Sequence, residues 1–183
     1  MNRAFVIAIN AVSGGGKTSL AKLLHESLPG SALFCFDEFD DTNVYPPDYY
    51  EWYLRGENLE EFDAPGMRAA VDEEIRRREK QFMVLDYPFG RDHSRFRDVI
   101  DLSIWVETPL DIAMARRILR DFLSPDSSVT DLRKELAEDL MHYVAKARQL
   151  YMDDRHRNSC DLVLDGAKPL DYLRDRILEA IPK

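Results

Sequence analysis

The residues with the clearest chemistry lie near the amino terminus, in the run Ala11-Val12-Ser13-Gly14-Gly15-Gly16-Lys17-Thr18. Glycines allow backbone conformations in which successive N–H groups point inward and form an anion-binding nest. A lysine directly after such a turn suits the β- and γ-phosphates of a nucleotide, and the following hydroxyl suits Mg²⁺. The run therefore predicts a phosphate-binding loop (P-loop). The residues expected to contact the nucleotide are Ser13, Gly14, Gly15, Gly16, Lys17, Thr18 and Ser19.

The segments on either side of this loop support the same interpretation. An apolar run predicts a strand over about 4–10, and a helical pattern after Lys17 predicts a helix that ends near Leu28. A strand, a glycine-rich turn and a helix are the context that a P-loop requires, and the helix N-terminus adds partial positive charge. Ala11 replaces the glycine that usually begins the motif, at a position that supports the turn more than the phosphates. A glycine turn without a ligand is the disfavoured alternative.

Two acidic residues come directly at the ends of later predicted strands. Asp37 follows the apolar run 31–36, and Asp86 ends the run 82–86. In parallel sheets, ligands bind at the carboxyl ends of the strands. We therefore expect Asp37 to accept the proton of an attacking hydroxyl or to hold a metal-bound water, and Asp86 to orient Mg²⁺ through water. With Thr18 they form the expected metal set. The alternative for each carboxylate is a loop cap.

Three arginines follow in a segment expected to be helical from Pro109 to about Phe122. Arg120 stands three and four residues after Arg117 and Arg116, so the spacing predicts a shared helical face. Guanidinium groups near a P-loop can hold the charge that spreads over a moving phosphoryl group. We predict catalytic roles for Arg117 and Arg120 and a nucleotide contact for Arg116. The alternative is a surface helix with an Arg117–Asp121 pair.

Strands and helices alternate along the whole chain. Predicted strands cover 4–10, 31–36, 82–86, 102–106 and 162–164. Predicted helices cover about 17–28, 65–80, 94–99, 109–122, 131–153 and 169–180, with a further short one near 49–53. This alternation predicts an α/β fold, a three-layer αβα sandwich with a five-stranded parallel sheet. We expect one domain over 1–183, with a helical lid segment at about 116–130.

Composition restricts the function classes. The net charge of −9 over 183 residues argues against a general nucleic-acid partner, which needs a basic face. The triplet Arg76–Arg78 is flanked by acidic residues and is expected to be solvated surface. The first apolar run is too short to span a membrane and is expected to be a strand, not a signal peptide. With Cys35 and Cys160 expected to be reduced, these features predict a cytoplasmic protein without a membrane partner. Assembly into a homo-oligomer is left open.

Four segments resemble the uridine kinase and nicotinamide riboside kinase group, in the same order. Phe36-Asp37-Glu38-Phe39 resembles that group's "DDFY" or "DDFF" stretch, and Phe62-Asp63-Ala64-Pro65 resembles "FDHP". Asp111–Asp121 is similar to the lid segment "DTRLSRRVLRD", and 143–166 to the closing "KYADVIIPRG" region. The chain is therefore identified as a uridine kinase-like member of the P-loop nucleoside and nucleotide kinases.

The resemblance implies ATP and Mg²⁺ as cofactors, Asp37 as the catalytic base, and Asp63 as a ligand of substrate hydroxyls. It also favours a functional role for Arg117 and Arg120 over the alternative of a surface helix. One departure is that the basic "RGR" turn of uridine kinases is replaced by Phe122–Asp126, which contains no arginine. Part of the phosphate and substrate clamp is therefore missing, and this puts uridine itself in doubt as the substrate.

Further substrate contacts are expected after the second and third strands. Tyr49 and Trp52, with Tyr45, either pack in the core or stack on a planar base. Arg91 and His93 follow the third strand and either face the substrate or lie on plain surface. The predicted substrate-binding set is Asp37, Tyr49, Trp52, Asp63, Arg91 and His93.

Two functional hypotheses follow. The first is a kinase that transfers the γ-phosphoryl of ATP to a hydroxyl of a small-molecule acceptor, with a nucleoside or riboside favoured. A nucleoside monophosphate is disfavoured because 37–65 contains only Arg55 to meet a second phosphate. The second is a regulatory P-loop ATPase without an acceptor. A GTPase is set aside because Asn158-Ser159-Cys160-Asp161 lacks the lysine of the guanine-reading motif. Within the kinase hypothesis, the residues do not rank ATP against GTP.

Overall fold

The computed structural model describes residues 3–125, 128–152 and 155–182. Its sheet contains five parallel strands in the order β2-β3-β1-β4-β5. The strands are β1 (Phe5–Asn10), β2 (Ser31–Cys35), β3 (Phe82–Asp86), β4 (Leu102–Glu107) and β5 (Leu162–Asp165). The predicted α/β sandwich with a five-stranded parallel sheet is therefore confirmed. Because β1 is the central strand, the loop that follows it lies at the middle of the carboxyl edge.

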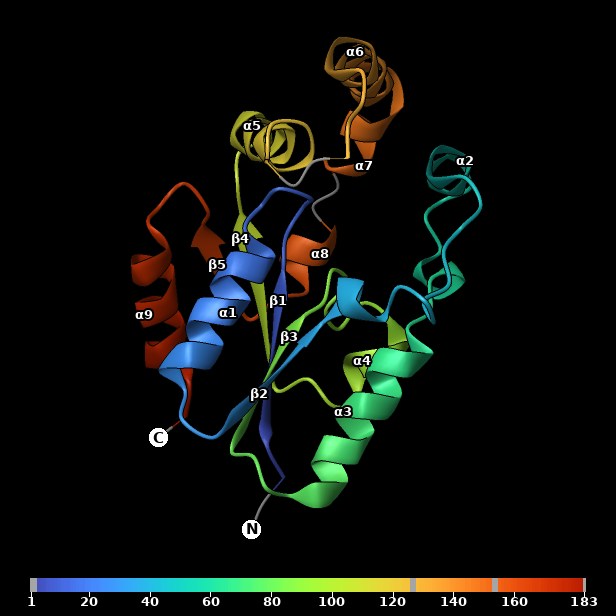
Figure 1. Ribbon diagram of the computed structural model, residues 1–183. Coiled ribbons are helices and arrows are strands. Elements are labelled where there is room, and N and C mark those ends of the chain that lie inside the picture. Colours follow the sequence, from blue (N-terminus) through green and yellow to red (C-terminus); the bar gives the residue numbers. More distant parts are fainter. Residues whose placement is uncertain (1–2, 126–127, 153–154, 183) are drawn as a thin grey trace.

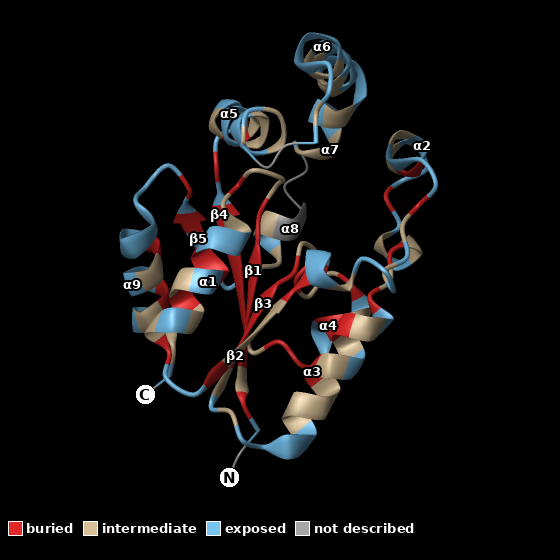
Figure 2. Cartoon of the chain, in the orientation of Figure 1, coloured by how far each residue is buried: buried red, intermediate tan, exposed pale blue. Residues whose placement is uncertain are grey.

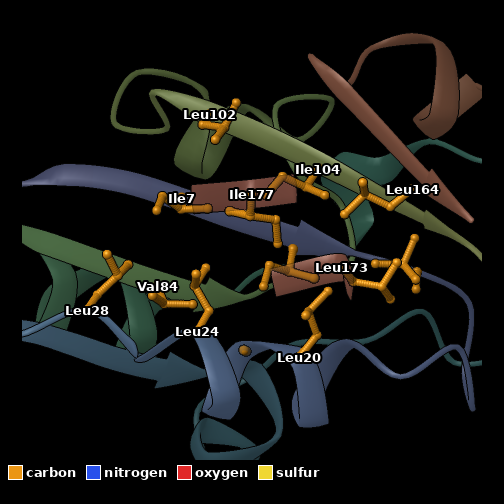
Figure 3. Packing of buried hydrophobic residues seen from close by; sticks show 14 residues of the cluster. Ile7, Leu20, Leu24, Leu28, Val84, Leu102, Ile104, Leu164, Leu173 and Ile177 are labelled. Carbon is orange, nitrogen blue, oxygen red and sulfur yellow. The ribbon is translucent and has the colours of Figure 1, made fainter. Parts of the chain in front are cut away.

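Helices cover both faces of the sheet, which explains why the strand sequences are nearly continuous apolar runs (Figure 1). On one face, α1 (Lys17–Ser27) and α9 (Leu170–Ala180) pack against β1, β3, β4 and β5. Figure 3 shows Leu20 and Leu24 of α1 with Leu173 and Ile177 of α9 over this face. All four side chains are fully or almost fully buried, so these two helices are fixed to the sheet beside the loop after β1.

On the other face, α3 (Pro65–Arg77) and α4 (Ser94–Arg97) complete the second layer. Met67 and Val71 of α3 and Phe96 of α4 are fully buried. Figure 2 shows the buried strands between the two helical layers, with exposed residues on the outer faces of the helices. Arg78 closes α3 in the left-handed conformation, with φ of 55°, so the helix ends before the expected limit near 80.

Most of the remaining elements stand beyond the carboxyl ends of the strands, whereas the short helix α8 (Arg155–Asn158) lies beside β4 (Figure 1). One group follows β2 and consists of η1 (Phe36–Phe39), α2 (Tyr49–Leu54) and η2 (Leu59–Glu61). The other group consists of α5 (Leu110–Asp121), α6 (Leu132–His142), the π-helical turn η3 (Tyr143–Ala147) and α7 (Arg148–Leu150). The strand expected to reach Phe36 ends at Cys35, so Asp37 lies in the helical turn η1.

The long helix expected over 131–153 is helical through Leu150 and contains a π turn at 143–147. Its expected end at Asp153 lies outside the described residues, as do residues 126 and 127 of the expected lid segment at 116–130. Across the described ranges, no helix is long and apolar enough to cross a membrane. Both cysteines are free thiols.

Candidate active site

The glycine-rich loop has the local geometry of an anion nest. Gly16 has φ of +97° and forms the N-cap of α1, where no side chain caps the helix. The first N–H groups of α1 are therefore left for a ligand, and the helix dipole favours an anion there. A Cβ at Gly14 would overlap the carbonyl of Ala113, so only glycine lets the loop pack against α5. The glycines between β1 and α1 thus let the backbone of the loop pack closely against α5 and leave its N–H groups accessible to a ligand.

Lys17 is the first residue of α1 and lies within electrostatic reach of Asp86, at the end of β3, and of Asp37, in the turn after β2. Burial lowers the pKa of Lys17, and the charges of Asp86 and Asp37 act in the opposite direction. A partly desolvated ammonium group beside these carboxylates is suited to a phosphate, because phosphate oxygens add the negative charge that stabilises its ionised form.

Thr18 and Asp86 meet at the expected metal position. Thr18 Oγ1 donates a hydrogen bond of 2.5 Å to Asp86 Oδ2. Burial raises the pKa of Asp86. The charge of Lys17 and the hydrogen bond from Thr18 oppose this rise, whereas the charge of Asp37 adds to it. A hydroxyl and carboxylates are hard oxygen donors of the kind that Mg²⁺ binds, so these residues fit the ion. In the part of the chain that is described, no three His, Cys, Asp or Glu residues form a metal cage. A Mg²⁺ ion would therefore depend on phosphate and water ligands as well.

The raised pKa of Asp86 leads to a stability prediction. Because the pKa is raised in the folded state, the protonated form favours folding at low pH, and this contribution is lost as pH rises through the folded pKa. At pH 8 the ionised, buried carboxylate therefore costs stability, and Asp86→Asn should raise the Tm of the nucleotide-free protein. Asparagine still offers an oxygen to Thr18. Each 1 kcal/mol corresponds to a Tm change of about 2–4 °C in a domain of this size.

Differential scanning fluorimetry at pH 8 and pH 5 tests this prediction. The advantage of Asp86→Asn should shrink toward pH 5, where the native carboxyl gains its proton more readily. Thr18→Val is the matched control, because it removes the hydrogen bond to Asp86 but leaves the carboxylate in place. A Tm of Asp86→Asn below that of the unaltered protein at pH 8 would contradict the argument.

One cleft of about 950 Å³ joins the P-loop to the groups that follow β2, β3 and β4. It contains many of the residues expected from the sequence, namely Ser13, Gly14, Gly16, Lys17, Thr18, Ser19, Asp37, Tyr49, Trp52, Asp86, Arg116 and Arg120. Gly15 is buried below the loop and does not line the cleft; its N–H bonds Val12 O at 2.9 Å. The carboxyl edge of the sheet therefore brings together most of the expected nucleotide and acceptor contacts.

Of the three arginines of α5, two border the cleft, and they are not the two that were expected to be catalytic. Arg116 and Arg120 line the cleft, and the guanidinium of Arg116 lies over Gly16 and near the carbonyl of Gly166. Arg117 instead pairs with Asp139 of α6 at 2.5 Å and lies over the ring of Tyr143. Residues four apart lie more nearly above one another on a helix than residues three apart, and here the face of Arg116 and Arg120 meets the P-loop. The structure thus places Arg117 in the packing between α5 and α6, away from the cleft.

Three other expected substrate contacts also have partners outside the cleft. Asp63 forms an ion pair with Arg95, and Arg91 pairs with Asp161 at 2.7 Å. His93 is 2% exposed, and its ring nitrogens bond Tyr87 Oη at 2.7 Å and the carbonyl of Phe62 at 3.0 Å. The carbonyl can only accept, so Nε2 of His93 donates to it, and Nδ1 accepts from Tyr87. Asp63 and His93 border a separate cavity of about 550 Å³ behind Phe62.

The sequence did not single out most of the aromatic residues that form the cleft wall. Phe62 is the centre of this wall. The ring of Tyr49 stacks on it with 5.8 Å between the ring centroids, and Trp52 meets it edge-on with 5.2 Å between the centroids. Phe89 lies 4.6 Å from Phe62. The residues that line the cleft but were not expected there include Phe36, Phe62, Phe89, Trp105 and Tyr151. Phe36, Phe62 and Phe89 come after strands two and three, which was the available signal, but an aromatic residue there is also a common core residue. Trp105 lies within β4 and Tyr151 follows α7, so the sequence contains no such signal for them.

The chain is similar to several known proteins in sequence and in fold. The chain is 24% identical to a uridine kinase of Streptococcus agalactiae over 178 aligned residues, which cover 82% of this chain and 85% of the relative. It is also 24% identical to a uridine kinase of Ligilactobacillus salivarius, with 96% and 97% of the two chains covered. The structure superposes on an APS kinase of Mycobacterium tuberculosis with a TM-score of 0.62 at 16% identity, over 98% of each chain. No family profile matches the chain.

The similarity to uridine kinases extends along most of the chain, and the structural match shows the shared fold. The P-loop after the central strand β1, Asp86 at the end of β3, Asp37 after β2, and Arg116 and Arg120 of α5 all line one cleft. The chain is thus similar to uridine kinases along most of its length and has the fold of the P-loop kinases, and these relatives support a kinase enzyme.

Proposed function

We propose that the protein transfers the γ-phosphoryl group of ATP to a hydroxyl of a small, uncharged, ring-bearing acceptor, with nucleosides and ribosides as the favoured class. The observation that carries this proposal is a single cleft with a P-loop at one end, an aromatic wall at the other and the carboxylate of Asp37 on its surface. Such an arrangement places a donor phosphate and an acceptor ring on either side of a base.

The donor half supports binding of the triphosphate. The N–H groups at the start of α1 and the ammonium of Lys17 would hold the β- and γ-phosphates. Arg116 and Arg120 extend from α5 over the same part of the cleft and would hold the charge that develops on the transferring group. Mg²⁺, when bound, supplies further charge neutralisation, and Thr18, Asp86 and Asp37 are the residues that would hold it directly or through water. The protein would then act mainly by positioning the reactants and stabilising charge, without forming a covalent intermediate.

The acceptor half supports Asp37 as the general base. Asp37 is exposed on the cleft, in the helical turn directly after β2. Its charge opposes the burial that lowers the pKa of Lys17. The pKa of Arg120 is raised mainly by its hydrogen bond with Asp121, and the charge of Asp37 adds to this rise, so Asp37 lies within electrostatic reach of the donor half. Within the described ranges its carboxylate accepts no hydrogen bond from a side chain or backbone group. An oxygen of Asp37 is thus available to take the proton of an acceptor hydroxyl.

The charge distribution favours an uncharged acceptor. Among the described residues that line the cleft, the cations are Lys17, Arg116 and Arg120, and all belong to the donor half. The acceptor half contains the aromatic wall around Phe62 and the carboxylate of Asp37. An anionic acceptor would lose hydration there without gaining a cationic partner. A planar ring can instead pack against Tyr49 or Trp52. The same wall favours a kinase over an ATPase that has no acceptor.

A thermal-shift screen tests this proposal. Uncharged nucleosides and ribosides are compared with their 5′-monophosphates and with sugar acids, each with Mg²⁺ and a non-hydrolysable ATP analogue. At 100 times its Kd, a ligand stabilises the protein by about 2.7 kcal/mol, which is a readily measured Tm shift. We expect stabilisation by uncharged ring-bearing alcohols and little or none by the anions. Stabilisation by the ATP analogue alone, with no acceptor effect across the screen, would instead support the regulatory ATPase.

A further inference from the structure

We propose that Thr108 is a positioning residue that orients the peptide between Gly15 and Gly16 for phosphate binding. Thr108 lies directly after β4, and its side chain does not border the cleft. The proposal rests on the proposed function in one respect, namely that the P-loop holds the phosphates of the donor. It adds a residue that acts on the loop from the buried side.

The hydroxyl of Thr108 is fixed to the back of the loop. Thr108 is 6% exposed, and its Oγ1 donates a hydrogen bond of 2.8 Å to the carbonyl oxygen of Gly15. The bond joins residues that are 93 positions apart in the chain. Because the carbonyl of Gly15 is buried, the hydroxyl satisfies an acceptor that water does not reach. The contact therefore connects the end of β4 to the middle of the glycine-rich loop.

Holding this carbonyl also sets the direction of the next N–H group. The described peptide bonds are all trans, so the N–H of Gly16 points opposite to the carbonyl of Gly15. The carbonyl points toward buried Thr108, whereas Gly16 borders the cleft. The N–H of Gly16 is thus directed to the cleft side, where the phosphates would lie. Gly16 has φ of +97°, in a region that glycine leaves easily, so an external restraint on this peptide is useful.

Neighbouring contacts hold both partners in place. The N–H of Gly15 donates to Val12 O at 2.9 Å, so both polar groups of Gly15 are occupied within the protein. Behind Thr108, a Cβ at Gly166 would overlap the threonine hydroxyl and would lie 2.9 Å from its Cα. The N–H of Gly166 donates to Glu107 O at 2.8 Å. Thr108 is therefore packed between Gly166, which follows β5, and Gly15 of the loop. This packing restricts the orientation of its hydroxyl.

A purely structural role would make a different prediction from a positioning role. If Thr108 only stabilised the fold, its loss would lower the Tm and affect every ligand alike, in proportion to the folded fraction. If it directs the N–H of Gly16, its loss should weaken the binding of phosphates in particular. Binding of the nucleoside part of the donor should then be unchanged, because an anion nest at a helix N-terminus acts on the phosphates.

The test compares Thr108→Val, which removes the hydroxyl at nearly constant volume, with Thr108→Ser, which retains it. Inorganic tripolyphosphate and ATP are titrated by calorimetry, and adenosine is measured by competition with a fluorescent ATP analogue. We expect Thr108→Val to weaken tripolyphosphate and ATP about 5–10-fold, as the loss of one hydrogen bond implies. We expect Thr108→Ser to stay within about 2-fold of the unaltered protein, and adenosine affinity to be unchanged in both variants.

Equal tripolyphosphate affinity in Thr108→Val and the unaltered protein would overturn the proposal, as would an equal loss for adenosine. Should Thr108→Val fail to fold, Thr108→Ala removes the hydroxyl without placing a methyl group against the carbonyl of Gly15. Absence of tripolyphosphate and ATP binding by the unaltered protein would overturn the P-loop assignment and the role of Thr108 together. Normal binding without phosphoryl transfer to any acceptor would overturn only the proposed kinase reaction.

Discussion

Replacement of Asp37 by asparagine is expected to lower kcat by about 10²–10⁴-fold, the usual contribution of a positioned general base. Asparagine has nearly the same shape, but its amide cannot take the proton of an attacking hydroxyl. Asp37 lies on the surface of the cleft, within electrostatic reach of Lys17 and Arg120. Because the N–H groups of the loop and Lys17 remain, affinity for ATP should change little. Single-turnover transfer and calorimetric ATP binding separate the two effects.

The control for this variant is Asp41→Asn, which removes the same charge from the same acidic segment. Asp41 is exposed and is not among the residues of the cleft. We therefore expect normal transfer by Asp41→Asn. Equal kcat for Asp37→Asn and the unaltered protein, with an acceptor that the screen has identified, would remove Asp37 from the role of base. Equal losses in both variants would point to net charge and not to proton transfer.

Truncation of either cleft arginine is expected to lower kcat by about 10²–10³-fold, the typical cost of losing one donor to developing charge. Arg116→Ala and Arg120→Ala each remove a guanidinium that borders the cleft. The loss should be larger in kcat than in ATP affinity, since the charge on the phosphoryl group spreads during transfer. Steady-state kinetics with both substrates at saturation measure this difference.

Arg117→Ala is the matched comparison, because it makes the same substitution one residue away on the same helix. Arg117 is 17% exposed and bonds Asp139 through two nitrogens. Its removal leaves the Asp139 carboxylate without this partner, and the expected cost is about 1–3 kcal/mol of stability. We expect a lower Tm and a kcat within a few-fold of normal at a temperature where the variant is folded. A kcat loss for Arg117→Ala as large as that for Arg116→Ala would contradict the division that the structure makes.

The framework of this protein follows directly from the order of residues along the chain. Apolar runs long enough for strands alternate with helical patterns, and parallel strands connected through helices must present their carboxyl ends at one edge. The position of the P-loop and of Asp37 and Asp86 at that edge is therefore a local property of each segment plus a general rule of topology. The same reasoning could not place Phe36, because a strand end and a short helical turn satisfy the same apolar pattern.

The fate of individual polar side chains depends on neighbours that are distant in the sequence. Asp63, Arg91 and His93 have the residue types that bind substrates. In the folded chain, however, Asp63 pairs with Arg95, Arg91 pairs with Asp161, and His93 donates to the carbonyl of Phe62. Nothing in the local sequence specifies those partners. The same holds for the aromatic wall, since Phe62 and Phe89 come from different loops and meet only in the folded chain.

The sequence by itself determined the glycine-rich loop, the sheet that carries it and the two carboxylates that follow β2 and end β3, because spacing along one segment is sufficient for each. Only the tertiary structure decided that Arg116 and not Arg117 accompanies Arg120 over the loop, and that Thr108 holds the loop from behind. A helix carries side chains in every direction, and a hydroxyl after a strand has many acceptors within reach. The packing of α5 against the P-loop and of β5 against β4 selects one of these arrangements.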